Sequence, residues 1–321
     1  MSMLARVFEA LAWLGRQGTR AIAASIFIGL ALPPLAALFK PLVAPAIFCL
    51  LVFAFLRVNP LALRSEFARP RVVLLATFWI MVAIPLALGT AYAALGSGEL
   101  WNALSLALIL QAAAPPIMSA PAFAALLGLD AALALATLIA TITVTPLTTP
   151  FFVGVFAREA LPLDPPMLAL RLLFFLAGSF LVAAFIRWLF GRDRVLAARE
   201  QVDGLSVVAL FVFAVALMES VAARLIAEPA LVLGLLALSF GLTFGLMALT
   251  ALVFRPIGIE RALALGLECG NRNLGLMLAA AGGLSDIVWL YFALAQFPIY
   301  LGPQLLSPLV RRLLRSRLPA G

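Results

Sequence analysis

Long apolar runs follow one another along almost the whole chain, and short stretches rich in proline, glycine or charge separate them. Each run holds about the twenty residues that an α-helix needs to cross a bilayer. The pattern predicts an all-α polytopic membrane protein with ten transmembrane helices. Their approximate limits are 21–39, 42–57, 71–95, 101–128, 131–156, 166–190, 204–226, 230–254, 260–283 and 286–309.

The composition indicates a single membrane domain. Of the 321 residues, 65% are hydrophobic and 11% are charged, whereas soluble domains are about half apolar and a quarter charged. No stretch is polar and long enough for a second, soluble domain, so residues 1–321 are expected to form one domain in the lipid bilayer. Residues 1–20 mix arginine with leucine, phenylalanine and tryptophan, and we expect them to lie as a helix on the membrane surface.

Topology explains the net charge of +8. When the N-terminus is placed inside, the outer segments hold only Lys40, Arg158, Arg171 and Arg224. The inner segments hold most of the basic residues: Arg6, Arg16, Arg20, Arg57, Arg64, Arg69, Arg71, Arg187, Arg192, Arg194, Arg199, Arg255, Arg261, Arg311, Arg312, Arg315 and Arg317. We therefore expect a bacterial inner (plasma) membrane protein with both termini in the cytoplasm and no nucleic-acid partner.

The chain divides into two halves of five spans each, on either side of Asp164. An odd number of spans per half gives the halves opposite orientations, so we expect an inverted repeat with repeat 1 at about 21–156 and repeat 2 at about 166–309. In such folds, interrupted helices occupy corresponding positions in the two halves. The fourth span is interrupted by three prolines, in the sequence Ala114-Pro115-Pro116-Ile117-Met118-Ser119-Ala120-Pro121.

The prolines of the fourth span remove helical hydrogen-bond donors and block the preceding turn. The backbone groups that are freed must face protein or water, so we expect a cavity near Pro115, Ser119 and Pro121. The alternative interpretation is a kinked helix end without a ligand.

The ninth span contains a polar island in an apolar run, Leu267-Glu268-Cys269-Gly270-Asn271-Arg272-Asn273-Leu274-Gly275. An ionisable residue near the middle of a bilayer costs roughly 2.5–3.5 kcal/mol on insertion scales, so it needs a partner or a function. Glu268 and Arg272 are four residues apart, which predicts that they share a helix face and pair. Gly270 lies between them and can loosen the helix, so that backbone carbonyls become available to a ligand.

These features resemble the bile acid:sodium symporter family over roughly residues 20–310. The resemblance is carried by the order of spans, the proline break, the pattern Glu268-x-Gly270-x-x-Asn273 and the threonine-rich end of the fifth span, Thr143-Val144-Thr145-Pro146-Leu147-Thr148-Thr149-Pro150. It implies a secondary active transporter of small organic anions, coupled to sodium. It also implies a core of helices 3–5 and 8–10, in which the broken helices 4 and 9 cross, and a panel of helices 1, 2, 6 and 7.

The chain departs from this family at the sodium ligands. The resemblance implies a first site made by a Ser-Asn pair in the fourth span, hydroxyls in the fifth span and the glutamate of the ninth. The pair falls on Ala120-Pro121 and the hydroxyls fall near Ala134 and Leu138, so Glu268 is the sodium ligand that is retained. A shift of one residue in the alignment would bring in Ser119 or Thr137. The oxygen set is incomplete for sodium, and no other cofactor is expected.

Arg272 stands where a second family site has a glutamine, and three roles are open for it. It can replace a sodium ion, attract an anionic substrate in a two-pronged contact, or form a structural ion pair with Glu268. A carboxylate that still titrates would instead couple transport to protons.

Four other polar side chains lie in the same two spans and their neighbours. Asn273 matches a family position and is expected to contact the substrate or the crossing, and Asn271 either joins it or bonds a neighbouring helix. Gln111 and Gln296 each serve either as interhelical contacts or as ligand groups. The motif Gly241-x-x-x-Gly245 predicts a close-packing helix face.

Other functions fit the sequence less well. An arsenite-type efflux protein of the same superfamily relies on a cysteine in the fourth-span region, and none is present there. An intramembrane enzyme needs a nucleophile with a base, or paired carboxylates, and the chain has no histidine and a single deep acid, Glu268. A non-transporting membrane sensor would be expected to carry a soluble signalling domain. Substrate identity, transport direction and oligomeric state are not specified by the sequence.

Overall fold

A computed structural model describes residues 3–58, 66, 70–96, 98–157, 160, 164–219 and 221–315. The predicted break at Asn59-Pro60 and the basic residues Arg64, Arg69, Arg158 and Arg317 lie outside these residues. The described elements are helices: α1 (Met3–Ala31), α2 (Pro33–Phe39), η1 (Lys40–Leu42), α3 (Val43–Arg57), α5 (Arg71–Phe78), η2 (Trp79–Ala83), α6 (Ile84–Leu95), α7 (Glu99–Ala113), α8 (Ala120–Leu126), α9 (Ala131–Phe156), α10 (Pro165–Phe190), α11 (Arg192–Ala197), α12 (Arg199–Leu217), α13 (Val221–Ala227), α14 (Pro229–Val253), η4 (Arg255–Ile257), α15 (Ile259–Gly270), α16 (Leu274–Ala281) and α17 (Asp286–Arg315).

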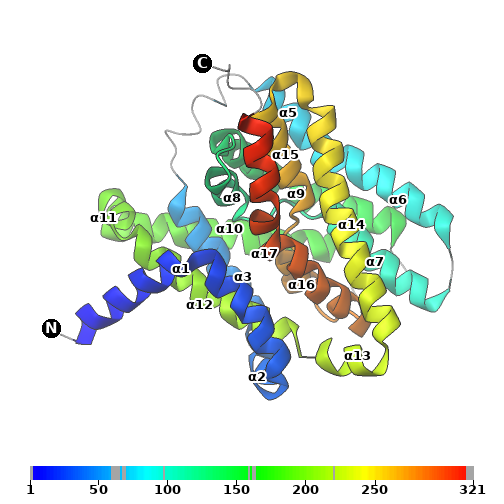
Figure 1. Ribbon diagram of the computed structural model, residues 1–321, viewed down its shortest axis with the longest axis horizontal. Helices are drawn as coiled ribbons and strands as arrows, with labels where there is room; N and C mark the ends of the chain where they lie inside the picture. Colours follow the sequence, from blue (N-terminus) through cyan, green and yellow to red (C-terminus); the bar gives the residue numbers. More distant parts are fainter. Residues whose placement is uncertain are drawn as a thin grey trace.

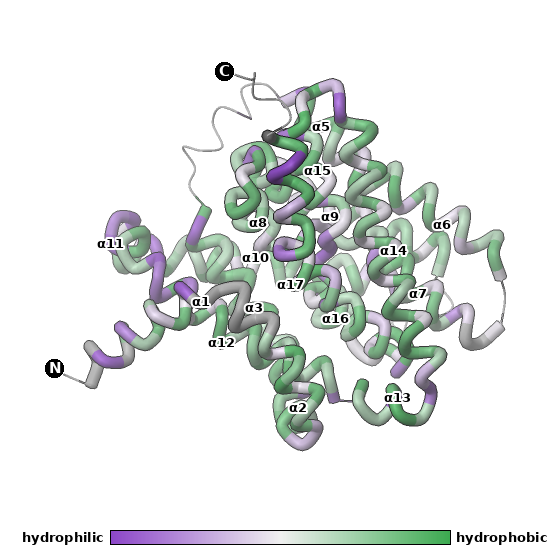
Figure 2. The backbone as a smooth tube through the Cα atoms, viewed as in Figure 1, coloured by the Kyte–Doolittle hydropathy of each residue, from purple (hydrophilic) through white to green (hydrophobic). Residues whose placement is uncertain are grey.

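The long helices have the length and composition of membrane spans. Within the described part of the chain, six helical segments are long and apolar enough to cross a bilayer: Pro33–Arg57, Arg71–Leu95, Ala131–Phe156, Pro165–Phe190, Arg199–Ala227 and Pro229–Val253. Hydrophobic residues run along these helices, and hydrophilic residues gather mainly near their ends (Figure 2). The predicted all-helical fold is confirmed, and the six long apolar helices support a polytopic, integral membrane protein.

The helices pack as two groups (Figure 1). In the first group, α1 packs along α12, and α3 packs against both α10 and α12. In the second group, α14 packs against α15 and α17, and α9 packs against α5, α7, α8 and α15. The groups meet where α10 contacts α9, where α16 contacts α3 and α10, and where α17 contacts α12. The candidate site lies at this junction.

The expected helix at residues 1–20 is present from Met3 onward, and its position on the membrane surface stays a prediction. This segment belongs to the continuous helix α1, which packs along α12. The two helix backbones are in direct contact at Gly15 and Gly204. A Cβ atom added to Gly15 would lie 2.5 Å from the carbonyl oxygen of Glu200, and a Cβ atom added to Gly204 would collide with the carbonyl oxygen of Leu11. Arg16 and Glu200 form an ion pair of 2.7 Å beside this contact. The N-terminal segment is therefore held by protein.

The prediction of a close-packing helix face at Gly241 and Gly245 is wrong. A Cβ added to either glycine would meet nothing within 4 Å. A small-x-x-x-small spacing permits a close approach of helices, but it does not supply a partner helix. At Gly15 and Gly204 the partner is present without such a motif.

We expect Gly204→Ala to destabilise the protein and Gly241→Ala to leave it as stable or more stable. Both changes remove a helix-interior glycine, which alone stabilises a helix by roughly 0.5–1 kcal/mol. Only at Gly204 does the new Cβ meet a backbone carbonyl, and overpacking costs typically about 1–3 kcal/mol. The measurement is the unfolding midpoint of each variant in detergent, and equal shifts for both would contradict the α1–α12 contact.

Candidate functional site

Two interrupted helices meet at the centre of the second group. The first interruption separates α7 from α8, because Pro115 and Pro116 cannot continue a helix and Ala114 is extended (φ −67°, ψ 146°). The second separates α15 from α16, where Asn271 is extended (φ −91°, ψ 94°). Asn273 then starts α16 as its N-cap, and its side-chain oxygen accepts from the backbone N–H of Leu276 at 3.0 Å.

The two interruptions satisfy each other's backbone groups. They form an antiparallel β-bridge between Pro116 and Arg272. The N–H of Ile117 donates to the carbonyl of Asn271 at 2.8 Å, and the N–H of Asn273 donates to the carbonyl of Pro115 at 2.8 Å. Each break would otherwise expose unpaired backbone groups in an apolar environment, where they are costly.

The bridge also explains why proline is tolerated at its centre. In an antiparallel pair, the residues of a non-hydrogen-bonded position use no N–H of their own toward the partner strand. The two hydrogen bonds flank Pro116 and come from Ile117 and Asn273, so its missing donor is not needed. The same proline that ends α7 therefore fits the pairing that replaces the helix.

Arg272 is fully buried and binds carbonyl groups of three segments. Its Nε donates to the carbonyl of Cys269 at 2.6 Å, and its Nη1 donates to the carbonyls of Ala114 at 2.8 Å and Ile80 at 3.2 Å. Its Nη2 contacts the Cys269 sulfur at 3.4 Å. Two of these carbonyls lie at the C-terminal ends of α15 and α7, where the helix dipoles favour a cation.

The third carbonyl is available because of a π-helical turn. In η2 the hydrogen bonds run from residue i to residue i+5, and for the carbonyl of Ile80 that partner is Pro85, which has no N–H. The Ile80 oxygen is left to accept from Arg272. A neighbouring hydroxyl completes the end of α7, since Thr149 Oγ1 donates to the carbonyl of Ala113 at 2.6 Å.

The predicted ion pair between Glu268 and Arg272 is wrong. The pairing rule assumes a continuous helix, but α15 ends at Gly270, between the two residues, and Arg272 turns to the carbonyls instead. Glu268 is fully buried, and neither of its carboxylate oxygens has a hydrogen-bond partner among the described residues. Arg272 therefore binds backbone carbonyls, and the carboxylate of Glu268 is left without a hydrogen-bond partner among the described residues.

Other buried polar atoms on the break and on the helices packed against α15 are also without partners. Both side-chain atoms of Asn271 and the hydroxyls of Thr137 and Thr243 are buried and make no hydrogen bond within the described structure. These residues come from the break and from α9 and α14, which both pack against α15. A Cβ on Gly270 would lie 2.5 Å from the carbonyl oxygen of Thr243, so α14 approaches this end of α15 closely. Unpartnered oxygens therefore occur on α15, on the break that follows it and on the two helices packed against α15.

A pocket lies beside the crossing, between the two helix groups. Of the predicted site residues, Ser119, Arg272, Asn273 and Gln296 line it. Its remaining walls come from α3, α12, the first break and α16, and they are mainly apolar: Ile47, Leu50, Leu51, Ile117, Met118, Leu210, Phe213, Leu274 and Gly275. Arg57 and Tyr300 also line it.

The other predicted residues have structural surroundings. Gln111 accepts a hydrogen bond from the hydroxyl of Tyr291. Gln296 donates to the carbonyl of Phe292 in its own helix at 3.0 Å, while its side chain borders the pocket. Pro115 contributes its carbonyl to the crossing, and Pro121 lies in the first turn of α8. Ser119 is the N-cap residue of α8, and its side chain makes no capping bond.

Sequence reasoning missed Arg57 and Tyr300 as pocket residues. Arg57 ends an apolar run and was interpreted only as an inward-facing charge, which is the usual meaning of such a residue. Tyr300 lies in an apolar span without any local motif. The sequence does not predict a pocket role for either residue, because the pocket is formed by helices that are far apart in the sequence.

Comparison with known proteins adds no assignment. No protein-family model matches the chain, and no curated protein matches it. Among the described residues, no cluster of three or more histidine, cysteine, aspartate or glutamate side chains is placed to hold a metal ion. The function therefore has to be argued from the crossing and the pocket beside it.

We expect Arg272→Met to destabilise the protein strongly. It leaves the carbonyls of Ala114, Ile80 and Cys269 without their donor, and each buried group left unpaired costs about 1–3 kcal/mol. The matched control is Arg255→Met, because Arg255 is exposed. A drop in unfolding midpoint confined to Arg272→Met is the expected result, and equal midpoints would show that the guanidinium does not hold the crossing.

Proposed function

We propose that this protein is a secondary active transporter of small organic anions, with ten membrane spans in two inverted halves. One observation carries the proposal: two interrupted helices, from the fourth and ninth predicted spans, exchange backbone hydrogen bonds beside a pocket between two helix groups. Paired broken helices at the interface of inverted repeats are the usual site of substrate and ion binding in such carriers.

The two helix groups match the moving parts that this function needs. The helices α1, α3, α10 and α12 form the panel, and the helices from α5 to α9 and from α14 to α17 form the core. Transport by alternating access rocks one such body against the other around a fixed site. The crossing lies within the core, and the pocket lies between core and panel, so substrate there would be exposed by a movement of one against the other.

The pocket extends toward the side assigned to the cytoplasm. Along α3 it extends from Ile47 to Arg57, a distance of roughly 15 Å for ten helical residues. At the Ile47 end the panel and core are in close contact, because a Cβ on Gly275 would collide with Ile47 and lie 3.0 Å from Phe213. Lys40 of the panel lies over the Trp289 ring of the core at 5.8 Å, also on the outer side. These contacts support an inward-open conformation.

The unpartnered oxygens of α15 and its neighbours support a site for a coupling cation. Sodium prefers carboxylate, amide and hydroxyl oxygens, and the unpartnered oxygens of Glu268, Asn271, Thr137 and Thr243 are of these kinds. An unpaired buried carboxylate is costly, so a bound cation would stabilise this region. Thr137 belongs to these unpartnered residues. The direct alignment with the family places Leu138 at the corresponding hydroxyl position, and a shift of one residue brings in Thr137.

A second sodium ion does not fit. The carbonyls of Cys269 and Ala114, which point at the crossing from the ends of two helices, are bound by Arg272. The guanidinium supplies a permanent positive charge at this position. Of the three roles open to Arg272, the replacement of an ion agrees best with these contacts, and we propose that the carrier couples to a single cation.

Reconstituted protein should take up small organic anions along a cation gradient. The test uses proteoliposomes and a panel of carboxylates and sulfoconjugates, with a sodium or a proton gradient. Gly275→Val adds bulk where Ile47 and Phe213 close the outer side, so it should slow uptake by about fivefold to a hundredfold, as overpacking of about 1–3 kcal/mol implies. Gly245→Val is the control, because a Cβ there meets nothing within 4 Å. Lack of uptake of every anion under both gradients would refute the transport function.

Sodium should stabilise the purified protein through Glu268. A ligand at a hundred times its Kd stabilises the native protein by about 2.7 kcal/mol. We expect a higher unfolding midpoint in sodium chloride than in choline chloride at equal ionic strength, and loss of this difference in Glu268→Gln.

The control for the sodium measurement is Glu219→Gln. Glu219 pairs with Lys40 at 2.5 Å on the outer side, away from the crossing. No sodium-specific shift in the wild type would exclude sodium as the coupling ion and leave the proton, which the gradient experiment tests separately.

A further inference from the structure

Two arginines, Arg272 and Arg57, line the pocket. They differ in the number of N–H donors that each has left for a ligand. A guanidinium has five N–H donors. Arg272 directs its donors to the carbonyls of Cys269, Ala114 and Ile80 and to the Cys269 sulfur. It is fully buried, so it offers little to a molecule in the pocket.

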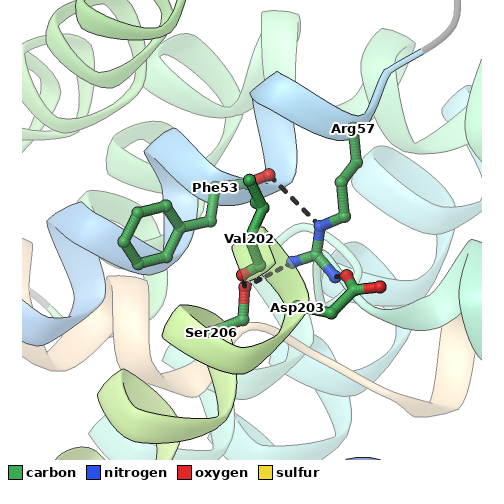
Figure 3. Close-up of polar contacts among 5 residues, drawn as sticks. All are labelled: Phe53, Arg57, Val202, Asp203 and Ser206. Atoms are coloured by element: carbon green, nitrogen blue, oxygen red, sulfur yellow. Dashed lines mark hydrogen bonds and ion pairs between the residues drawn. The ribbon is translucent and has the colours of Figure 1, made fainter. Parts of the chain in front are cut away.

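Arg57 keeps two of its donors and is accessible. Its Nε donates to the carbonyl of Phe53 at 3.2 Å, its Nη1 to Asp203 at 2.9 Å and its Nη2 to Ser206 at 3.0 Å (Figure 3). These contacts hold the guanidinium between α3 and α12, and 31% of the side chain is exposed. One N–H on each Nη atom has no described partner. Because Arg57 lines the pocket, an anion there can reach a guanidinium that is already oriented.

A second pocket residue has an unused polar group. The hydroxyl of Tyr300 is buried and has no hydrogen-bond partner among the described residues, and Tyr300 lines the same pocket from α17. A buried hydroxyl without a partner is unfavourable. The hydrogen bonds of Arg57 can be explained by the packing of α3 against α12 alone. That packing does not explain why the hydroxyl of Tyr300 is buried without a partner.

We propose that Arg57 of the panel and Tyr300 of the core bind the anionic head of the transported molecule. The inference rests on the proposed transport function. The ligand class is a monoanion with an apolar body, since the guanidinium supplies one positive charge and the walls beside it, including Leu50, Leu51 and Leu210, are apolar. Asp203 keeps Arg57 oriented and competes with the ligand's anionic group for its donors.

The site joins the two bodies that move during transport. Arg57 belongs to α3 and Tyr300 to α17. A ligand held by both would bridge panel and core, so the two parts of the site would separate when the bodies move apart. A pocket built this way binds its anion in one conformation more tightly than in the other, which is what a carrier requires.

The test compares 2-naphthoate with its uncharged analogue 2-naphthamide, by calorimetry on the purified protein at neutral pH. Wild-type protein should bind the carboxylate more tightly than the amide. Arg57→Gln should weaken binding of 2-naphthoate by about tenfold to a hundredfold, as expected for one charge-assisted hydrogen bond, and leave 2-naphthamide nearly unchanged. Asp203→Asn should strengthen binding of 2-naphthoate, because a competing like charge is removed.

Two further variants separate binding from folding. Tyr300→Phe removes only a hydroxyl that has no described partner, so it should weaken the binding of 2-naphthoate without lowering the unfolding midpoint. Arg16→Gln breaks the ion pair with Glu200, which joins α1 to α12 and does not line the pocket, so it should leave the carboxylate preference intact.

The outcomes distinguish the site from the transport function. The proposed site is wrong if the wild type shows no preference for the carboxylate, or if Arg57→Gln keeps that preference. An unchanged affinity in Tyr300→Phe would remove Tyr300 from the site. A preference that depends on Arg57, together with no uptake into proteoliposomes, would support the anion site and refute the transport function.

Discussion

The structure depends on the need to satisfy backbone hydrogen bonds where no water is available. Each broken helix frees N–H and C=O groups in the apolar interior, where an unpaired group costs several kcal/mol. The bonds from Ile117 to Asn271 and from Asn273 to Pro115 remove this cost for both breaks together. Neither break is stable without the other, so the crossing of the two helices is a consequence of their interruption.

The same constraint separates the two charges of the ninth span. An unbroken helix would bring Glu268 and Arg272 together, and their mutual neutralisation would leave nothing for a ligand. The break turns Arg272 toward carbonyls at the ends of α7 and α15, where it closes the crossing. Glu268 stays in the intact part of α15 without a partner. A carboxylate with unused oxygens is therefore a product of the backbone geometry.

Sequence patterns predicted the features that depend on local chemistry. Apolar runs predicted the helices, and the limits 71–95 and 131–156 agree with Arg71–Leu95 and Ala131–Phe156. Three prolines and a polar island predicted the two breaks. Features that depend on a partner helix were missed, since the Gly241 motif has no neighbour while Gly204 has one. Arg57 and Tyr300 reach the pocket only through the packing of α3 and α17 on opposite sides of it.

The fixed charge of Arg272 also changes the charge balance of the proposed transport cycle. A carrier with two cation sites moves one net positive charge together with a monoanion, so the membrane potential contributes about 2.3 kcal/mol per 100 mV to accumulation. In the proposed cycle the guanidinium would stay in the core at one of the two positions, and only the cation at Glu268 would travel with the anion. The moving charges then cancel, and the cation gradient alone would drive uptake. In the proposed cycle, replacement of an ion by a side chain would thus remove a driving force while the crossing that holds the site is preserved.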